Sequence, residues 1–390
     1  MPDEINTSAP SAEVKPHLEA EADFGAPYLA PEWALGPAKT LGLRLSANPV
    51  NPEEGDSRAA ERAWARLAPS LGAFKHLISA GGRISRGYNS IPPALAEQIR
   101  ASINVFESLL NDVIGNAAEE NSTTKALVGN WAQSELLPYL LLSNIGERWY
   151  TKPRGYAGDY LTIAQMYEDR ERGASRLGAA LDRGFLNVHA SQAVKNRRKL
   201  MVDEIRHTIG MVGIRPAQVT SLACGPAQEV SDVLASLPDP SVLHVNLIDN
   251  DGGALNYATK LLGHALQADR IGLFEENIVY LADGRRPNLI SGQDLVYSIG
   301  LIDYFSDKYV VSLMNLAHAM LRPGGRVILG NFHPRNMSKA FMDHILEWQL
   351  IHRTEGDLNR LFRASAFGRP STRVQYEHQR INLFAECVRV

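Results

Sequence analysis

Two hydrophobic patterns divide the chain. Up to about residue 212, apolar residues recur at steps of three and four, the period of amphipathic helices. After residue 213, short apolar runs alternate with helical patterns, as is typical of parallel strands joined by helices. The pattern predicts an α-helical domain over residues 56–212 and an α/β domain over 213–390. Residues 1–55 are rich in proline and lack a sustained period, so we expect a flexible tail.

The helical half contains one clear apolar stripe, after the prolines at 92 and 93. Its members follow steps of three and four: Ile99, Ile103, Phe106, Leu110 and Val113. The simpler interpretation of this stripe is the core of a helical bundle. A groove for a lipid tail is the alternative.

The most informative pattern lies over residues 219–229. An apolar run over 219–223 has strand character, Gly225 permits a tight turn, and an amphipathic segment begins at Glu229. A second apolar run ends at Asp249. An acid at that place, about 20 residues past the turn, can accept hydrogen bonds from a ribose diol. We therefore predict a nucleotide-like cofactor here. A plain strand-to-helix connection, with Asp249 facing water, is the alternative.

The turn has a single glycine, because Pro226 and Ala227 stand where a dinucleotide-binding turn needs more. A pyrophosphate requires bare backbone around it. S-adenosylmethionine (SAM) carries adenosine without phosphate, so one obligatory glycine suffices. The sequence thus favours SAM over a dinucleotide.

The same strand-then-helix unit recurs downstream. Residues 278–283 predict a third strand ending at Asp283 and Gly284, and residues 293–298 predict a fourth, followed by Gly300. Parallel sheets bind ligands at the carboxyl ends of their strands, so we expect Ser298 and Gly300 at the cofactor crevice.

This order of elements resembles a class I SAM-dependent methyltransferase domain over residues 213–390, most specifically in the run LRPGGRVIL at 321–329. The resemblance implies a Rossmann-like, mostly parallel sheet of seven strands. The last strand would be antiparallel, with residues 381–390 as the candidate. It also implies that Gly225 lies against the methionine part of SAM and that Asp283 lies beside the adenine.

A narrower resemblance rests on three segments, YTKPRGYAGDY at 150–160, GNFH at 330–333 and WQLIHR at 348–353. Together they resemble bacterial methyltransferases of hydroxy fatty acid (3-hydroxypalmitic acid) methyl ester biosynthesis. The resemblance implies a small or fatty-acid-like acceptor whose carboxylate becomes a methyl ester.

The segment 152–160 is too polar for a core and too compact for a linker, and loops of this kind carry function. We expect it to fold over the cofactor, with Tyr156 and Tyr160 flanking the sulfonium or the acceptor. Asp159 would cap the next helix or meet the methionine ammonium. The alternative is a helix cap among solvated charges.

Three downstream residues are candidates for holding the acceptor: Asn331, His333, and Arg353 on a helix that also carries Trp348. Arg353 would pair with a carboxylate through two hydrogen bonds. A carboxylate needs no general base, whereas a hydroxyl does. The alternative functions are an N- or O-methyltransferase of a secondary metabolite, with His333 as the base, and a SAM-binding regulatory protein without turnover.

Composition narrows the remaining classes. The net charge of −3 disfavours nucleic-acid binding, and we interpret the basic run 195–199 as a solvated helix face. Cys224 and Cys387 are the only cysteines, which fits a reducing cytoplasm and predicts no metal site. No apolar run approaches the roughly 18 residues of a membrane span. We expect a cytoplasmic enzyme, and the oligomeric state stays open.

Overall fold

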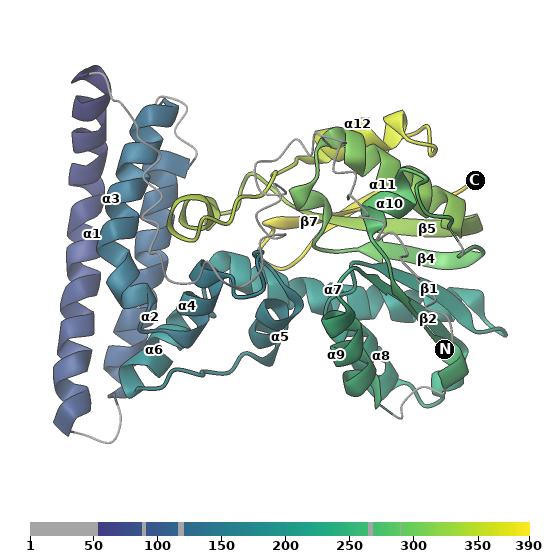
Figure 1. Cartoon of the computed structure of the whole chain (residues 1–390), viewed down its shortest axis with the longest axis horizontal. Helices are drawn as coiled ribbons and strands as arrows, with labels where there is room; N and C mark the ends of the chain where they lie inside the picture. Colours follow the sequence, from purple (N-terminus) through teal and green to yellow (C-terminus); the bar gives the residue numbers. More distant parts are fainter. Residues whose placement is uncertain (1–53, 88–90, 116–120, 264–267, 289) are drawn as a thin grey trace, which may run out of the picture.

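The computed structural model describes residues 54–390 except 88–90, 116–120, 264–267 and 289. The predicted tail therefore lies outside the described residues, apart from its last two positions. These begin helix α1 (Glu54–Gly87). Figure 1 shows a bundle of long helices beside an α/β domain, with shorter helices between them.

The helical region is built from amphipathic helices, as the pattern predicts. Asn121 accepts a hydrogen bond from the backbone N–H of Thr124 and so caps α3. After α1, the helices are α2 (Pro93–Leu110), the π-helix η2 (Asn111–Gly115), α3 (Ser122–Leu140), α4 (Asn144–Thr151), α5 (Tyr160–Glu168), α6 (Arg176–Phe185) and α7 (His189–Val212).

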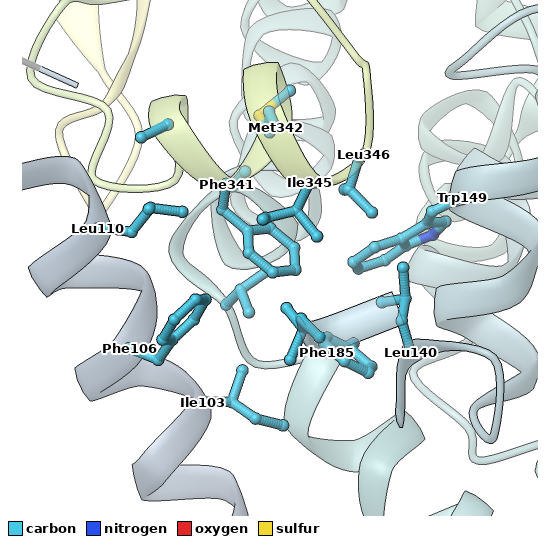
Figure 2. Close-up of a cluster of buried hydrophobic side chains, with 14 of the residues drawn as sticks. Ile103, Phe106, Leu110, Leu140, Trp149, Phe185, Phe341, Met342, Ile345 and Leu346 are labelled. Atoms are coloured by element: carbon cyan, nitrogen blue, oxygen red, sulfur yellow. The ribbon is translucent and has the colours of Figure 1, made fainter. Parts of the chain in front are cut away.

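The apolar stripe of α2 and η2 packs in the interior. All five of its members are at most 3% exposed. Figure 2 shows Ile103, Phe106 and Leu110 facing Phe185 and Phe341. The core interpretation of the stripe is thus confirmed.

The α/β domain contains a seven-stranded sheet in the order β3-β2-β1-β4-β5-β7-β6. Strand β7 is antiparallel to both neighbours, and the remaining pairs are parallel. The predicted fold is confirmed, with the candidate last strand present as β7. The strands are β1 (Ala217–Leu222), β2 (Leu243–Asp249), β3 (Ile271–Glu275), β4 (Gln293–Ser298), β5 (Leu321–Phe332), β6 (Arg373–Tyr376) and β7 (Asn382–Val388).

Helices cover both faces of the sheet. One face packs against α7, α8 (Gln228–Ser236) and α9 (Gly252–Leu262). The other packs against α10 (Ile278–Ala282), α11 (Asp307–Met320) and α12 (Glu355–Ala364). These two layers are visible in Figure 1. Because α7 contacts both β1 and β4, the last helix of the helical region is part of the α/β core.

Two of the predicted elements are wrong. Residues 278–282 form helix α10, capped by the Asn277 side chain, and the third strand is β3 instead. Strand β3 lies at the sheet edge and Leu273 is 44% exposed, so this strand has no continuous apolar run. Residues 348–353 are not helical, and α12 begins only at Glu355.

The segment after β5 joins the two regions. It turns through the π-helix η7 (Phe341–Ile345), whose apolar side chains enter the core of the helical region. Figure 2 shows Ile345 and Leu346 beside Leu140 and Trp149. The helical region is thereby fixed next to the carboxyl ends of β4 and β5.

Candidate functional site

The turn after β1 is a strained segment with open space on one side. Gly225 has a φ of 53°, and Ala223 and Ala227 also lie in the left-handed region. A Cβ atom added at Gly225 would meet no heavy atom within 4 Å. The backbone of the turn therefore leaves room for a ligand to approach closely.

Asp249 lies at the carboxyl end of β2 and faces this turn. One carboxylate oxygen accepts a hydrogen bond from the Gly225 N–H at 2.9 Å, and the other accepts from the Asp251 N–H at 3.0 Å. Burial raises the pKa of the Asp249 carboxyl, and the two N–H donors oppose that rise. A carboxylate has about four acceptor positions, so roughly two remain for a ligand.

The loop 152–160 is attached to the carboxyl edge of the sheet at two places. Arg154 forms an ion pair with Asp251, in the turn after β2. Tyr304, in the 3₁₀ helix η6 (Ile302–Tyr304) after β4, donates a hydrogen bond to the Ala157 carbonyl at 3.2 Å. The loop consequently crosses the edge from β2 to β4, as a covering segment must.

Tyr156 lies within electrostatic range of the predicted ribose acid. Burial raises the pKa of the Tyr156 hydroxyl, and the carboxylates of Asp249, Asp251 and Asp159 raise it further. The residue is 41% exposed. Its hydroxyl is therefore protonated at neutral pH and is available as a donor near Asp249.

The other two loop residues have partners within the protein. Asp159 accepts hydrogen bonds from the N–H groups of Leu161 and Thr162, which makes it the N-cap of α5, and it pairs with Arg148. This geometry matches the helix-cap interpretation of Asp159. Tyr160 packs on Tyr257 of α9 with ring centroids 5.6 Å apart, which ties the loop to α9.

Asp283 and Gly284 follow a helix rather than a strand. The Asp283 carboxylate accepts a hydrogen bond from Arg285 at 2.6 Å, and this pairing lowers the pKa of Asp283. The end of β3 instead places Glu276 beside Asp249, whose carbonyl accepts from the Glu276 N–H at 3.0 Å. Sequence reasoning missed this position because β3 itself was missed.

Two predicted site residues lie at the end of β4. Ser298 has a structural role, and Gly300 is close to a neighbouring side chain. Ser298 is 1% exposed and donates to the Leu222 carbonyl at 2.9 Å, so it ties β4 to β1. Gly300 lies directly against the guanidinium of Arg197 from α7. Arg197 is a residue of this edge that sequence reasoning missed.

Asn331 and Arg353 interact with each other and with the backbone. Arg353 is 2% exposed, and its five N–H groups donate to the carbonyls of Ile302 and Phe305, to Asn331 and twice to Asp307. Asn331 donates to the carbonyls of Phe332 and Ile351. Because every Arg353 donor is used, this geometry indicates that Arg353 holds η6 in place rather than binding an acceptor.

His333 is 5% exposed and lies after β5. Its Nδ1 accepts a hydrogen bond from the Arg335 N–H at 3.0 Å, and its Nε2 lies 3.4 Å from the Glu355 carboxylate. Burial and the charge of Arg335 lower the pKa of His333, so the ring is neutral at pH 7. The neutral ring then carries its proton on Nε2, and its lone pair on Nδ1 is engaged.

The strand order and the glycine turn facing Asp249 define a Rossmann-like domain of the methyltransferase class. Residues 155–378, more than half of the chain, match a family described as "Putative methyltransferase". The chain belongs to this family. No curated protein matches it in sequence.

One solved structure shares the fold, and others are similar to part of the chain. A possible exported protein from Bordetella parapertussis is 18% identical over 77% of this chain and 99% of its own, with a TM-score of 0.54. Magnesium protoporphyrin IX methyltransferase from Synechocystis PCC 6803, with bound S-adenosylhomocysteine (SAH), is 12% identical over 52% of this chain and 87% of its own, with a TM-score of 0.40. No helix in the described ranges is long and apolar enough to cross a membrane.

Proposed function

We propose that this protein transfers a methyl group from SAM to the carboxylate of a small or lipid-like acceptor, such as a 3-hydroxy fatty acid, giving a methyl ester. The observation that carries the proposal is the open turn at Gly225 next to the Asp249 carboxylate. The two remaining acceptor positions of Asp249 match the two hydroxyls of a ribose.

The residues of the edge fit the donor. Asp249 would hold the ribose, Gly225 would lie against the methionine part, and the 152–160 loop with Tyr156 would cover the site. This loop is already fastened across the edge through Arg154 and Tyr304. Such a cover excludes water and restricts the reactants, and orientation alone can contribute about 7 to 11 kcal/mol.

A carboxylate acceptor fits the chemistry of the described side chains. SAM supplies the activated methyl group; the new O–CH₃ bond forms as the S–CH₃ bond breaks, and no proton moves. The Nδ1 lone pair of His333 accepts a hydrogen bond from the Arg335 N–H. His333 is therefore disfavoured as the general base that a hydroxyl acceptor would need. Asn331 and Arg353 would act indirectly, by holding η6 beside the end of β5.

The donor part is tested by calorimetric titration of SAM. Asp249→Ala should weaken binding by at least about tenfold, because charge-assisted hydrogen bonds to the ribose are lost. Asp239→Ala is the matched control, since Asp239 is an exposed cap at the opposite end of β2. Equal affinity of both variants and the wild type would refute the ribose assignment.

The acceptor part is tested with methyl-labelled SAM and 3-hydroxy fatty acids. We expect a labelled product that releases methanol in mild base, as an ester does. A base-stable product would overturn the ester and favour N- or O-methylation of another metabolite. Tight SAM binding without any product from a panel of acids would favour a regulatory protein.

A further inference from the structure

Arg197 is a buried cation at the carboxyl edge of the sheet. It comes from α7, and the residue is 6% exposed. A Cβ atom added at Gly300 would lie 2.9 Å and 3.0 Å from its two terminal nitrogens. The guanidinium therefore packs directly on the backbone at the end of β4, and Gly300 leaves it the room to do so.

Arg197 differs from the other buried arginines in its bonding. Arg353 uses all five N–H groups, and Arg326 pairs with Glu204 and Glu386. The Nε of Arg197 has no hydrogen-bond partner, and within the described ranges this residue forms no ion pair at 4 Å or less. The uncharged Tyr167 hydroxyl lies beside it. A buried guanidinium normally has a carboxylate or several acceptors.

Two buried acids attract Arg197 through space, but each is bonded elsewhere. Glu229 accepts a hydrogen bond from the Tyr297 hydroxyl at 2.7 Å, and Asp303 accepts from the Phe332 N–H at 2.6 Å. Burial raises the pKa of both carboxyls, that of Asp303 to about 6. These acids keep the cation in place without occupying its Nε.

Arg197 also lies where one end of the proposed donor would reach. Strand β1 is paired with β2 on one side and with β4 on the other, so the Gly225 turn stands between Asp249 and Gly300. With its ribose at Asp249, SAM would extend past Gly225 toward Gly300. Its amino acid end would then approach the guanidinium.

We propose that Arg197 binds the α-carboxylate of the amino acid part of SAM, through the planar pair of N–H groups that a guanidinium offers to a carboxylate. This assignment rests on the proposed function, since it requires SAM at the Asp249 edge. The acceptor carries the only other carboxylate of the proposed reaction, and the experiment therefore has to separate the two.

The test is calorimetric binding of SAH and of its decarboxylated analogue, without acceptor. Wild-type protein should bind SAH about 10- to 100-fold more tightly than the analogue, the range expected for a charge-assisted hydrogen bond. Arg197→Met should weaken SAH binding by a similar factor and bind both ligands equally. Arg197→Lys should keep part of the preference, because a lysine retains the charge but not the planar fork.

Lys199→Met is the matched control, because Lys199 is an exposed residue of the same helix and should leave both affinities unchanged. Thermal unfolding of each variant checks its folding, and Arg197→Lys carries the test if Arg197→Met does not fold. An unchanged preference for SAH in the Arg197 variants would overturn the assignment alone. So would normal SAH binding combined with a raised KM for the acceptor. Failure of the wild type to bind SAH would instead overturn the proposed function itself.

Discussion

The guanidinium of Arg154 pairs with the Asp251 carboxylate at 2.7 Å, and Asp251 in turn donates its backbone N–H to Asp249. The loop 152–160 is thus connected through one residue, Asp251, to the Asp249 carboxylate. Asp251 also caps α9 by accepting from the Gly253 N–H at 2.8 Å. The position of the loop and the order of the β2–α9 turn therefore depend on the same residue.

Breaking this pair should loosen the loop without unfolding the protein. Arg154 is 34% exposed on its side chain, so the pair contributes about 1 kcal/mol or less to stability. We expect Arg154→Met to increase hydrogen exchange over residues 152–160 and to weaken SAM binding several-fold at an unchanged melting temperature. Arg66→Met, on the exposed face of α1, is the control. Unchanged exchange in the loop would contradict the coupling.

The sequence patterns predicted the buried strands and missed the two edge strands, β3 and β6, which have no fully buried residue. Strands β1, β2 and β4 are covered on both faces and appear as apolar runs. Strand β3 is at the edge, and the apolar run expected there belongs to α10. The family resemblance implies that Asp283 lies beside the adenine, and that position rests on the strand expected over 278–283, which is α10 instead. A short helix and a short strand cannot be separated by hydrophobicity alone.

The positions of candidate residues were predictable where one local segment determines them. Gly225 and Asp249 follow from strand ends, whereas the role of Arg353 depends on three segments that meet only in the fold. Arg197 lies in the basic run 195–199, which the sequence predicts to be a solvated helix face. Lys199 is indeed exposed, whereas Arg197 is buried. The signal was its helical spacing with Val194 and Met201, both buried, which places it on the inner face of α7.

We expect Arg353 to stabilise the fold rather than to bind the acceptor. Arg353→Met leaves the carbonyls of Ile302 and Phe305 and the side chain of Asn331 without their donor. Losing a buried charged donor of this kind costs about 3 to 5 kcal/mol, which urea unfolding measures. Arg363→Met, on the exposed face of α12, should change little. A stable Arg353→Met protein with a raised KM for the acid would restore the direct role of Arg353.

His352 should make the fold sensitive to acid. Burial and the nearby charge of Lys339 together lower the pKa of His352 from 6.5 to about 4. In the unfolded chain His352 therefore binds a proton near pH 6.5, whereas in the folded protein it does so only near pH 4. The contribution of neutral His352 to the free energy of unfolding is present above pH 6.5 and is lost as the pH falls toward 4.

Between pH 7 and 5 this difference amounts to about 2 kcal/mol in the free energy of unfolding. His352→Gln should remove that part of the pH dependence in urea unfolding at the two pH values. His76→Gln is the control, because His76 is exposed on α1. A His352→Gln protein with the full wild-type slope would show that other groups cause the acid sensitivity.

Gly300→Ala should act on SAH binding through Arg197. The added Cβ would lie 2.9 to 3.2 Å from the guanidinium, so Arg197 has to move away from the end of β4. We expect about a tenfold loss of SAH affinity and little change for the decarboxylated analogue. The double variant Gly300→Ala/Arg197→Met should bind no more weakly than Arg197→Met alone, because both changes remove the same contact.

Gly210→Ala provides the control in the helix that carries Arg197. A Cβ atom there meets no heavy atom within 4 Å, and alanine in a helix interior should stabilise the fold by roughly 0.5 to 1 kcal/mol relative to glycine. Its SAH affinity should equal that of the wild type. If the effects of Gly300→Ala and Arg197→Met on SAH affinity were instead additive, Gly300 would act on the ligand directly. The displacement of Arg197 by the added Cβ atom would then not explain the loss of affinity.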